Sequence, residues 1–237
     1  MLLSAKDLQL VLNGRIIFSI DDFDLHPGEV IALIGPNGAG KSSLLLTLSL
    51  IQKPTGGTIL FKGRAVSKAN LLALRKRMAL VFQEALLLDT TVKRNIKIAL
   101  HIRGISGHEA DTRTKRWLER FGILHLANRQ ARQLSGGEAQ RASLARAFSL
   151  EPEVLFLDEP FASLDYPTRK ALLKELGGII REMGIATVFV THDPTEIPYL
   201  ATRVKVLHNG RMIKSGTVDA VLGARVVECE ELSLWPD

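Results

Sequence analysis

A glycine-rich segment followed by lysine and serine constrains this chain more than any other feature. Residues 35–42 read Gly-Pro-Asn-Gly-Ala-Gly-Lys-Ser, which matches the pattern G-x-x-x-x-G-K-[ST]. The segment follows Val30–Ile34, a continuous apolar run typical of a strand buried on both faces of a parallel sheet. A leucine-rich stretch that favours a helix comes directly after it. The pattern predicts a nucleotide phosphate site in an α/β layer fold, and a GTPase, a kinase or a motor would satisfy it equally.

Each position of this phosphate loop has a physical role. Glycines let successive backbone N–H groups turn inward around phosphate oxygens, and Lys41 supplies a positive charge to the β- and γ-phosphates. The hydroxyl of Ser42 is suited to bind Mg²⁺, and the helix that begins at Lys41 adds the positive end of its dipole. The residues expected to bind the nucleotide here are Gly35, Pro36, Asn37, Gly38, Ala39, Gly40, Lys41, Ser42 and Ser43.

A second apolar strand ends in two carboxylates. Val154–Leu157 is followed by Asp158 and Glu159. A strand buried on both faces places Asp158 at the carboxyl edge of the sheet, beside the phosphate loop, where it can hold Mg²⁺ through water. Glu159 lies one residue further on and is suited to orient or polarise an attacking water. Taken alone, Asp-Glu after a strand is more often a solvated turn. Because the chain also has a phosphate loop, we interpret the two carboxylates here as part of the nucleotide site.

The remaining pattern predicts an α/β alternation interrupted by helices. Asn13-Gly14 marks a tight turn between two short strands, 8–12 and 15–20, and residues 24–29 read as a second turn. From residue 84 to about 148 no buried strand is evident, and the spacing and charge indicate a helical insert. Other expected strands are 58–61, 78–82, 154–157, 187–190, 203–207 and 211–214, and the expected helices are 41–50, 92–102, 108–121, 137–148 and 167–182.

Composition and charge narrow the functional classes. The chain has 237 residues, 46% hydrophobic and 24% charged, which is typical of a globular protein. A net charge of +6 favours an anionic partner such as a nucleic acid, a membrane surface or a phosphate ligand. The single cysteine, Cys229, cannot form an internal disulfide, which fits a reducing compartment. We expect no secretory signal, because the N-terminus lacks a basic segment followed by an apolar stretch. We expect no membrane span, because no apolar run approaches the roughly 20 residues required.

A third motif brings in a known family. Leu134-Ser135-Gly136-Gly137-Glu138 lies upstream of the acidic strand, and with it the sequence resembles the nucleotide-binding subunit of ATP-binding cassette (ABC) proteins, whose hallmark is the LSGG[QE] signature. The resemblance runs from about residue 8 to 222. Gln83 matches the Q-loop glutamine of the family, Ser163-Leu164-Asp165 matches its D-loop, and His192 in Thr191-His192-Asp193 matches its switch histidine.

The resemblance implies a fold. We expect the P-loop NTPase fold of an ABC nucleotide-binding domain: α/β, with a mostly parallel core sheet, an N-terminal antiparallel β subdomain and a helical insert. Residues 1–237 would form one ABC ATPase domain, in which 1–83 and 146–237 make up the core with its β subdomain. Residues 84–145 would form the helical subdomain that carries the signature.

The resemblance also implies a reaction and a dimer. ATP would be hydrolysed by water attacking the γ-phosphorus in line, with Glu159, His192, Lys41 and Gln83 as catalytic residues and Mg²⁺ held by Ser42, Gln83 and Asp158. Ser135, Gly136 and Gly137 begin a predicted helix, so they would form a second anion site. Two chains would dock head to tail in a homodimer or pseudo-dimer, and each signature would cap the ATP of its partner.

One position departs from the family pattern. Members usually carry an aromatic residue in the first hairpin, where it stacks on adenine, and the best-aligned residue here is Leu12. Leucine offers apolar contact without π-stacking, which weakens the expected preference for ATP over GTP. Phe18 is the aromatic residue nearby that would substitute.

The features around the motifs favour a transport cassette. A DNA-repair or chromosome-organising relative would need a long insert with heptad repeats or zinc-binding cysteines, and this sequence shows neither. Translation-factor relatives usually carry two cassettes in one chain, whereas the motifs here occur once. The form Asp158-Glu159-Pro160-Phe161 resembles importers, and residues 82–96 are similar to tungstate/molybdate-type oxyanion importers, with Leu86–Leu88 either lining a groove for the membrane subunit or packing the helical lobe.

We therefore expect an importer ATPase on the cytoplasmic face of the membrane. Its partners would be multi-spanning permease subunits and, indirectly, an extracytoplasmic solute-binding protein, with no nucleic acid. The alternatives are a non-transport cassette that acts on a protein or nucleic-acid assembly, and an exporter. The tail from Arg225 to Asp237 has no assigned role.

Overall fold

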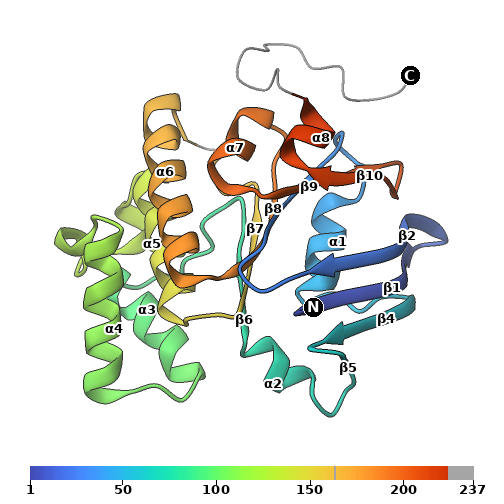
Figure 1. Cartoon of the computed structure of the whole chain (residues 1–237). Helices are drawn as coiled ribbons and strands as arrows, with labels where there is room; N and C mark the ends of the chain where they lie inside the picture. Colours follow the sequence, from blue (N-terminus) through green and yellow to red (C-terminus); the bar gives the residue numbers. More distant parts are fainter. Residues whose placement is uncertain (163, 224–237) are drawn as a thin grey trace.

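The computed structural model describes residues 1–162 and 164–223, arranged as two β-sheets with helices on both sides of the larger one (Figure 1). Ser163 of the predicted D-loop, Cys229 and the tail from Arg225 to Asp237 lie outside the described residues. The fold class expected from the sequence, an α/β core with an antiparallel N-terminal sheet and a helical insert, is confirmed.

The core sheet is mostly parallel and has the order β10-β9-β3-β8-β7-β6. All neighbours pair in parallel except β10 with β9. Every residue of β3 and β8 is buried, because helices or a second sheet cover both faces. The strands of this sheet are β3 (Val30–Ile34), β6 (Met78–Val81), β7 (Val154–Asp158), β8 (Ala186–Val190), β9 (Arg203–His208) and β10 (Arg211–Thr217).

The N-terminal sheet is antiparallel and has the order β2-β1-β4-β5. Asn13 and Gly14 form the predicted tight turn, with φ values of 51° and 76° that suit a two-residue hairpin. Leu3, Ala5, Leu8 and Leu10 of β1 point into the core. The strands are β1 (Leu3–Leu12), β2 (Arg15–Leu25), β4 (Gly56–Phe61) and β5 (Arg64–Ala65).

The helices divide between the two faces of the core sheet. Helix α1 (Lys41–Leu48) shares a hydrophobic cluster with the antiparallel sheet and one face of the core sheet. Four helices pack on the opposite face: α3 (Val92–Ile102), α4 (Gly107–Arg120), α5 (Gly136–Ser149) and α6 (Tyr166–Met183). The short helices are α2 (Leu71–Arg75), α7 (Ile197–Leu200), α8 (Val218–Leu222) and three 3₁₀ turns, η1 (Leu124–Leu126), η2 (Ala131–Gln133) and η3 (Pro194–Glu196).

The four helices α3 to α6 begin and end within one residue of the predicted ranges, and the interval 84–148 is helical as expected. The prediction was wrong at several element ends. Strand β1 begins at Leu3 rather than residue 8, and β10 ends at Thr217 rather than residue 214. Helix α1 ends at Leu48 rather than residue 50, since Leu50 adopts a left-handed conformation with φ 64°. Strand β2 continues through Leu25, so the second turn begins only at residue 26. The short elements α2, β5, α7 and α8 were not foreseen, because a segment of a few residues carries too little periodicity.

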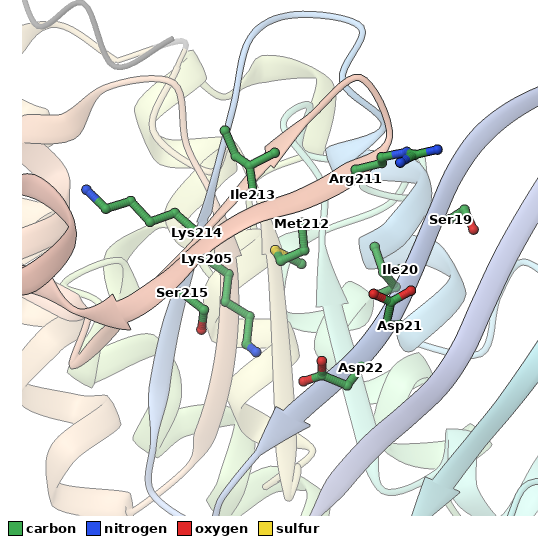
Figure 2. A pocket seen from close by; sticks show the side chains of 10 residues that line it. All are labelled: Ser19, Ile20, Asp21, Asp22, Lys205, Arg211, Met212, Ile213, Lys214 and Ser215. Carbon is green, nitrogen blue, oxygen red and sulfur yellow. The ribbon is translucent and has the colours of Figure 1, made fainter. Parts of the chain in front are cut away.

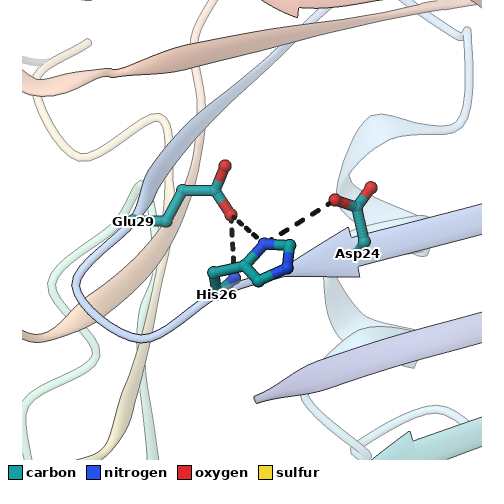
Figure 3. Close-up of side chains that lie close together, drawn as sticks. All are labelled: Asp24, His26 and Glu29. Atoms are coloured by element: carbon teal, nitrogen blue, oxygen red, sulfur yellow. Dashed lines mark hydrogen bonds and ion pairs between the residues drawn. The ribbon is translucent and has the colours of Figure 1, made fainter. Parts of the chain in front are cut away.

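An ion-pair network joins the two sheets, and Figure 3 shows its acidic side, with His26 between Asp24 and Glu29. Asp24 of β2 accepts from Arg203 Nη1 at 2.7 Å and from Lys205 Nζ at 2.8 Å, both on β9. Arg203 Nη1 also donates to Glu29 at 2.9 Å. His26 lies beside Asp24 and Glu29, a grouping that resembles a metal site. Since Arg203 and Lys205 already neutralise both carboxylates, the group holds the sheets together and does not serve as a cation site.

We expect Asp24→Asn to lower the free energy of unfolding by about 3 kcal/mol, because it leaves the ammonium of Lys205, only 2% exposed, without its carboxylate. The hydrogen bond from Arg203 holds the pKa of Asp24 far below its usual value. The stabilisation is therefore present at neutral pH and is lost as the pH falls below about 4. Urea unfolding at pH 7 and at acid pH measures both effects.

Asp22→Asn, at an exposed position of the same strand, is the control and should change the free energy of unfolding by less than about 0.5 kcal/mol. Equal effects of the two substitutions would contradict the assignment.

Candidate functional site

The phosphate loop, residues 35–40, connects β3 to α1 and is closely packed from behind. A Cβ on Gly35 would lie 2.0 Å from the carbonyl oxygen of Leu207, and one on Gly40 would lie 2.8 Å from that of Ile17. Gly38 faces open space, but its φ of 80° also disfavours a side chain. The loop therefore requires glycine at these positions, and its backbone is held against β9 and the first hairpin.

Lys41 is a buried cation in this loop. Its side chain is 6% exposed, and Nζ donates to the carbonyl oxygens of Gly35 at 2.7 Å and Pro36 at 3.0 Å. Burial lowers its pKa, and the nearby Glu159 and Asp158 oppose that shift. Within residues 1–162 and 164–223 the structure records no ion pair for Lys41. The first turn of α1 has neither a capping side chain nor an acidic residue. An anion bound at this helix start would satisfy both features, so the residues fit a phosphate.

Ser42 and Asp158 meet in front of α1. The Ser42 hydroxyl donates to Asp158 Oδ1 at 3.0 Å. Burial raises the pKa of Asp158, and the neighbouring Glu159 raises it further. A hydroxyl and a carboxylate in contact are oxygen ligands of the kind that Mg²⁺ binds, and the ion would compensate the buried charge. Gln83, the third predicted ligand, is exposed beyond the end of β6, and no hydrogen bond to Ser42 or Asp158 is recorded for it in the described chain.

Glu159 and His192 lie in direct contact. Their side chains approach to 3.0 Å between Oε2 and Nδ1, and because a carboxylate only accepts, the hydrogen lies on Nδ1. Glu159 adopts a left-handed backbone with φ 44°, unusual for a residue other than glycine, and its N–H donates to Val190 at 3.0 Å. This bend presents the carboxylate beyond the end of the strand while the imidazole remains 56% exposed.

The sheet order explains why these residues gather. Strands β3, β8, β7 and β6 are adjacent and parallel, so their carboxyl ends share one edge. The phosphate loop follows β3, His192 follows β8, the pair Asp158 and Glu159 ends β7, and Gln83 follows β6. Ligands of open α/β sheets bind at this edge. The structure thus brings together every predicted site residue outside the signature, with Gln83 at the rim.

The signature residues lie elsewhere. Ser135 is the N-cap of α5, where its Oγ accepts from the N–H of Glu138 and its own N–H donates to the Glu138 carboxylate at 2.8 Å. This capping box leaves Gly136 and Gly137 at the start of the helix, and a Cβ on Gly136 would meet nothing within 4 Å. Helix α5 packs on the face of the core sheet opposite to α1. One chain therefore does not place its signature on its own phosphate loop.

The first hairpin lies beside the phosphate loop. Leu12, at the end of β1, is 44% exposed and Ile16 across the turn is 58% exposed. Ile17 places its carbonyl against Gly40. Phe18 is fully buried in the core. The expectation that Phe18 takes the place of the missing aromatic residue was therefore wrong, and the surface next to the loop is aliphatic.

The segment after Gln83 is held by neighbouring helices. Arg146 of α5 donates to the carbonyl of Leu86 at 2.8 Å, and Asn95 of α3 bonds both the N–H and the C=O of Leu88. Leu86 and Leu88 are 54% and 49% exposed, whereas Leu87 packs against the core. One leucine of this run therefore packs the helical lobe and two face solvent.

Sequence reasoning missed a buried polar cluster behind His192. Thr191 donates to Glu196 at 2.6 Å, and Arg169 of α6 contacts Asp193 at 3.0 Å. Glu196 is 3% exposed, and burial raises its pKa to about 7. The signal in the sequence is Thr191-His192-Asp193-Pro194-Thr195-Glu196, where four polar side chains flank a histidine after a buried strand.

A separate cleft of about 540 Å³ opens between β2 and β10 (Figure 2). Lys205 points into it from β9, and its walls carry both acidic and basic side chains, among them Asp21, Asp22 and Arg211. None of the predicted site residues lines it. The cleft is therefore not the predicted nucleotide site.

Known proteins share both the sequence and the fold. Residues 18–162 match the model of the ABC transporter family. The chain is 41% identical over 205 residues to the sulfate/thiosulfate import ATP-binding protein CysA of Caulobacter vibrioides, covering 84% of this chain and 60% of that protein. It is 37% identical over 216 residues to the methionine import ATP-binding protein MetN of Xanthomonas axonopodis pv. citri, covering 89% and 64%. The chain thus spans about three fifths of the length of these relatives.

A solved structure extends the likeness to three dimensions. The ATP-binding cassette MJ0796, a dimer in a post-hydrolysis state bound to ADP and Pi, superposes with a TM-score of 0.81 at 25% identity, covering 91% of this chain and 98% of that one.

Glu196→Gln tests the electrostatics of the cluster. A carboxyl group whose pKa is raised from 4.5 to about 7 by folding destabilises the folded state as the pH rises between those values. Glutamine still accepts from Thr191 but has no charge. We expect the variant to gain on the order of 3 kcal/mol relative to wild type between pH 4.5 and pH 8, measured by urea unfolding. Glu84→Gln, at an exposed position, is the matched control and should show no such trend. A flat difference for both variants would contradict the prediction.

Proposed function

The chain belongs to the ABC transporter family, and from this premise we propose that it is the ATP-hydrolysing subunit that powers import of a solute through a separate membrane permease. The observation that carries the proposal is the shared sheet edge. A buried lysine in a glycine loop, a serine–aspartate pair and a glutamate–histidine pair follow adjacent parallel strands there. We treat residues 1–237 as one cassette with a core of 1–83 and 146–237 and a helical part of 84–145. A hydrophobic cluster common to both parts supports their being one unit.

Nucleotide binding rests on the loop and the first turn of α1. Lys41 would exchange the carbonyls of Gly35 and Pro36 for phosphate oxygens, and the backbone N–H groups of residues 40–43 would donate to the same anion. Ser42 and Asp158 would hold Mg²⁺, with Gln83 joining after a movement of its exposed segment. An ion held by these residues would supply positive charge that neutralises the phosphates.

Hydrolysis would follow at Glu159. Its carboxylate projects past the strand end and is suited to orient a water and to take a proton from it as the oxygen attacks the γ-phosphorus. The bond to the β-γ bridging oxygen breaks, and ADP and phosphate leave. His192 would act here as an imidazolium, which donates from Nδ1 to Glu159 and from Nε2 to the γ-phosphate. Lys41 stabilises the negative charge of the transition state.

Glu159→Gln separates binding from turnover. We expect the variant to bind ATP with near wild-type affinity and to hydrolyse it about 10²–10⁴-fold more slowly, since it keeps the shape but loses the base. Lys41→Ala is the companion variant and should weaken nucleotide binding by about 10–100-fold, because a charged hydrogen-bond donor is removed. Equilibrium binding of a fluorescent ATP analogue and phosphate release measure the two quantities. Unchanged turnover in Glu159→Gln would remove Glu159 from the mechanism.

We propose a head-to-tail dimer in the ATP state. The signature lies on the opposite face of the sheet from α1, so a second chain is needed to bring residues 135–137 to the phosphates. The dimeric state of the similar cassette MJ0796 supports this arrangement. In the dimer, the exposed start of α5 would donate N–H groups to the γ-phosphate of the partner's ATP.

The membrane partner is inferred from an exposed apolar surface and from the relatives. Among the described residues no helix is both long and apolar enough to cross a bilayer. Leu86 and Leu88 present exposed leucines on a segment tied to both α3 and α5. We propose that these leucines receive a cytoplasmic helix of a multi-spanning permease, placing the chain peripherally on the cytoplasmic face of the membrane. An extracytoplasmic solute-binding protein would act indirectly through the permease.

For the cargo we propose an oxyanion such as tungstate. The relative named for sulfate and thiosulfate import supports an oxyanion, and the resemblance of residues 82–96 to tungstate/molybdate-type importers adds to it. The relative named for methionine import, at 37% identity, represents the competing class. Cargo is selected by the permease and its binding protein, so transport assays with those subunits decide between the two.

Co-purification tests the permease contact. We expect the tagged chain, extracted from membranes in mild detergent, to recover a multi-spanning membrane protein, and the double change Leu86→Asp/Leu88→Asp to lose it because charge is buried at the contact. Leu72→Asp, at a leucine of α2 that is 69% exposed, is the matched control and should retain the partner. Recovery of ribosomes or DNA in place of a membrane protein would contradict the importer proposal.

A further inference from the structure

We propose that Arg169 is a positioning residue of the ATPase, which ties the D-loop segment to the strand end that carries His192 and thereby sets the Glu159–His192 pair. The inference rests on the proposed function and adds a residue that the motif reading does not contain. Arg169 lies in the first turn of α6, four positions after its N-cap Asp165.

The guanidinium of Arg169 reaches in two directions. Nη2 donates to the carbonyl oxygen of Leu164, in the D-loop segment, at 3.1 Å. Nη1 donates to Asp193 Oδ2 at 3.0 Å and lies 3.9 Å from Glu196 Oε1. A planar fork with fixed donor directions can hold both partners at once, whereas the single ammonium of a lysine cannot reproduce this geometry.

The residues on both sides of His192 belong to this network. Thr191, before it, donates to Glu196 Oε2 at 2.6 Å. Asp193, after it, donates its N–H to Thr191 Oγ1 at 3.0 Å and accepts from the N–H of Thr195 at 2.9 Å. The backbone of His192 is thus fixed from both neighbours, and its exposed imidazole keeps one orientation toward Glu159, at 3.0 Å.

The charges explain why the network depends on Arg169. Asp193 and Glu196 both lie at the guanidinium of Arg169. Burial raises the pKa of Glu196, the charge of Asp193 raises it further, and Arg169 lowers it. Glu196 is 5% exposed in its side chain and Arg169 is 24% exposed, so water screens these charges poorly. Without the guanidinium, the two carboxylates would separate or one would take up a proton, and Asp193 would lose its tie to α6. Either change moves the backbone next to His192.

The test compares Arg169→Gln with Arg181→Gln. Arg181 lies on the same helix and donates to the backbone carbonyl of Tyr199, so its loss removes an equal charge and a similar bond away from His192. We expect Arg169→Gln to lower kcat by about 10–100-fold, the order expected for a misplaced catalytic group, with the Kd for ATP changed less than about two-fold. Arg181→Gln should leave both unchanged. Arg169→Lys should give an intermediate kcat and serves as the test if the glutamine variant fails to fold.

A double variant distinguishes positioning from general stability. If Arg169 acts through His192, the combination Arg169→Gln/His192→Ala should hydrolyse ATP no more slowly than His192→Ala alone, in single-turnover assays with labelled ATP. Losses that multiply, or a wild-type kcat in both Arg169→Gln and Arg169→Lys, would overturn the inference. Failure of the wild-type chain to hydrolyse ATP, alone or with its permease, would instead overturn the proposed function.

Discussion

The burial of a positive charge at the start of α1 is the constraint on which the rest of the site depends. Lys41 is almost inaccessible to water and is held by two loop carbonyls, which are weak partners for a charge. Glycines that tolerate no Cβ fix the loop around it, and the uncapped first turn adds a positive field. The fold maintains this unfavourable arrangement because β3, buried on both faces, anchors the loop in the centre of the sheet.

The two carboxylates of the site lie at the end of β7, next to the phosphate loop. Asp158 and Glu159 end β7, and burial and mutual repulsion make the ionised form of Asp158 costly without a cation. The positive charges that would relieve it, Lys41 and a bound Mg²⁺, lie toward the phosphate loop. A nucleotide with its metal ion thus completes the electrostatics of both halves, which is the physical basis for the proposed ATP site.

The two faces of the core sheet carry different parts of the proposed ATPase. On one side, α1 and the antiparallel sheet hold the phosphate loop. On the other, α5 carries the signature, and its Arg146 holds the carbonyl of Leu86 beside the exposed leucines. A second chain at the signature and a permease at the leucines would therefore act on one rigid helix. Arg169 of α6 forms a comparable tie between the D-loop segment and the strand end of His192.

The sequence by itself determined the phosphate loop, the acidic strand, the tight hairpin and the long helices, because each is encoded by local spacing of glycine, charge or apolar residues. Only the tertiary structure decided that Phe18 is buried, that Gln83 stands at the rim, and that Arg169, Thr191, Asp193 and Glu196 surround the backbone of His192. These facts depend on contacts between segments distant in the chain, such as α6 with the end of β8. Local periodicity carries no record of such contacts, since burial and hydrogen bonding are settled only when the layers pack.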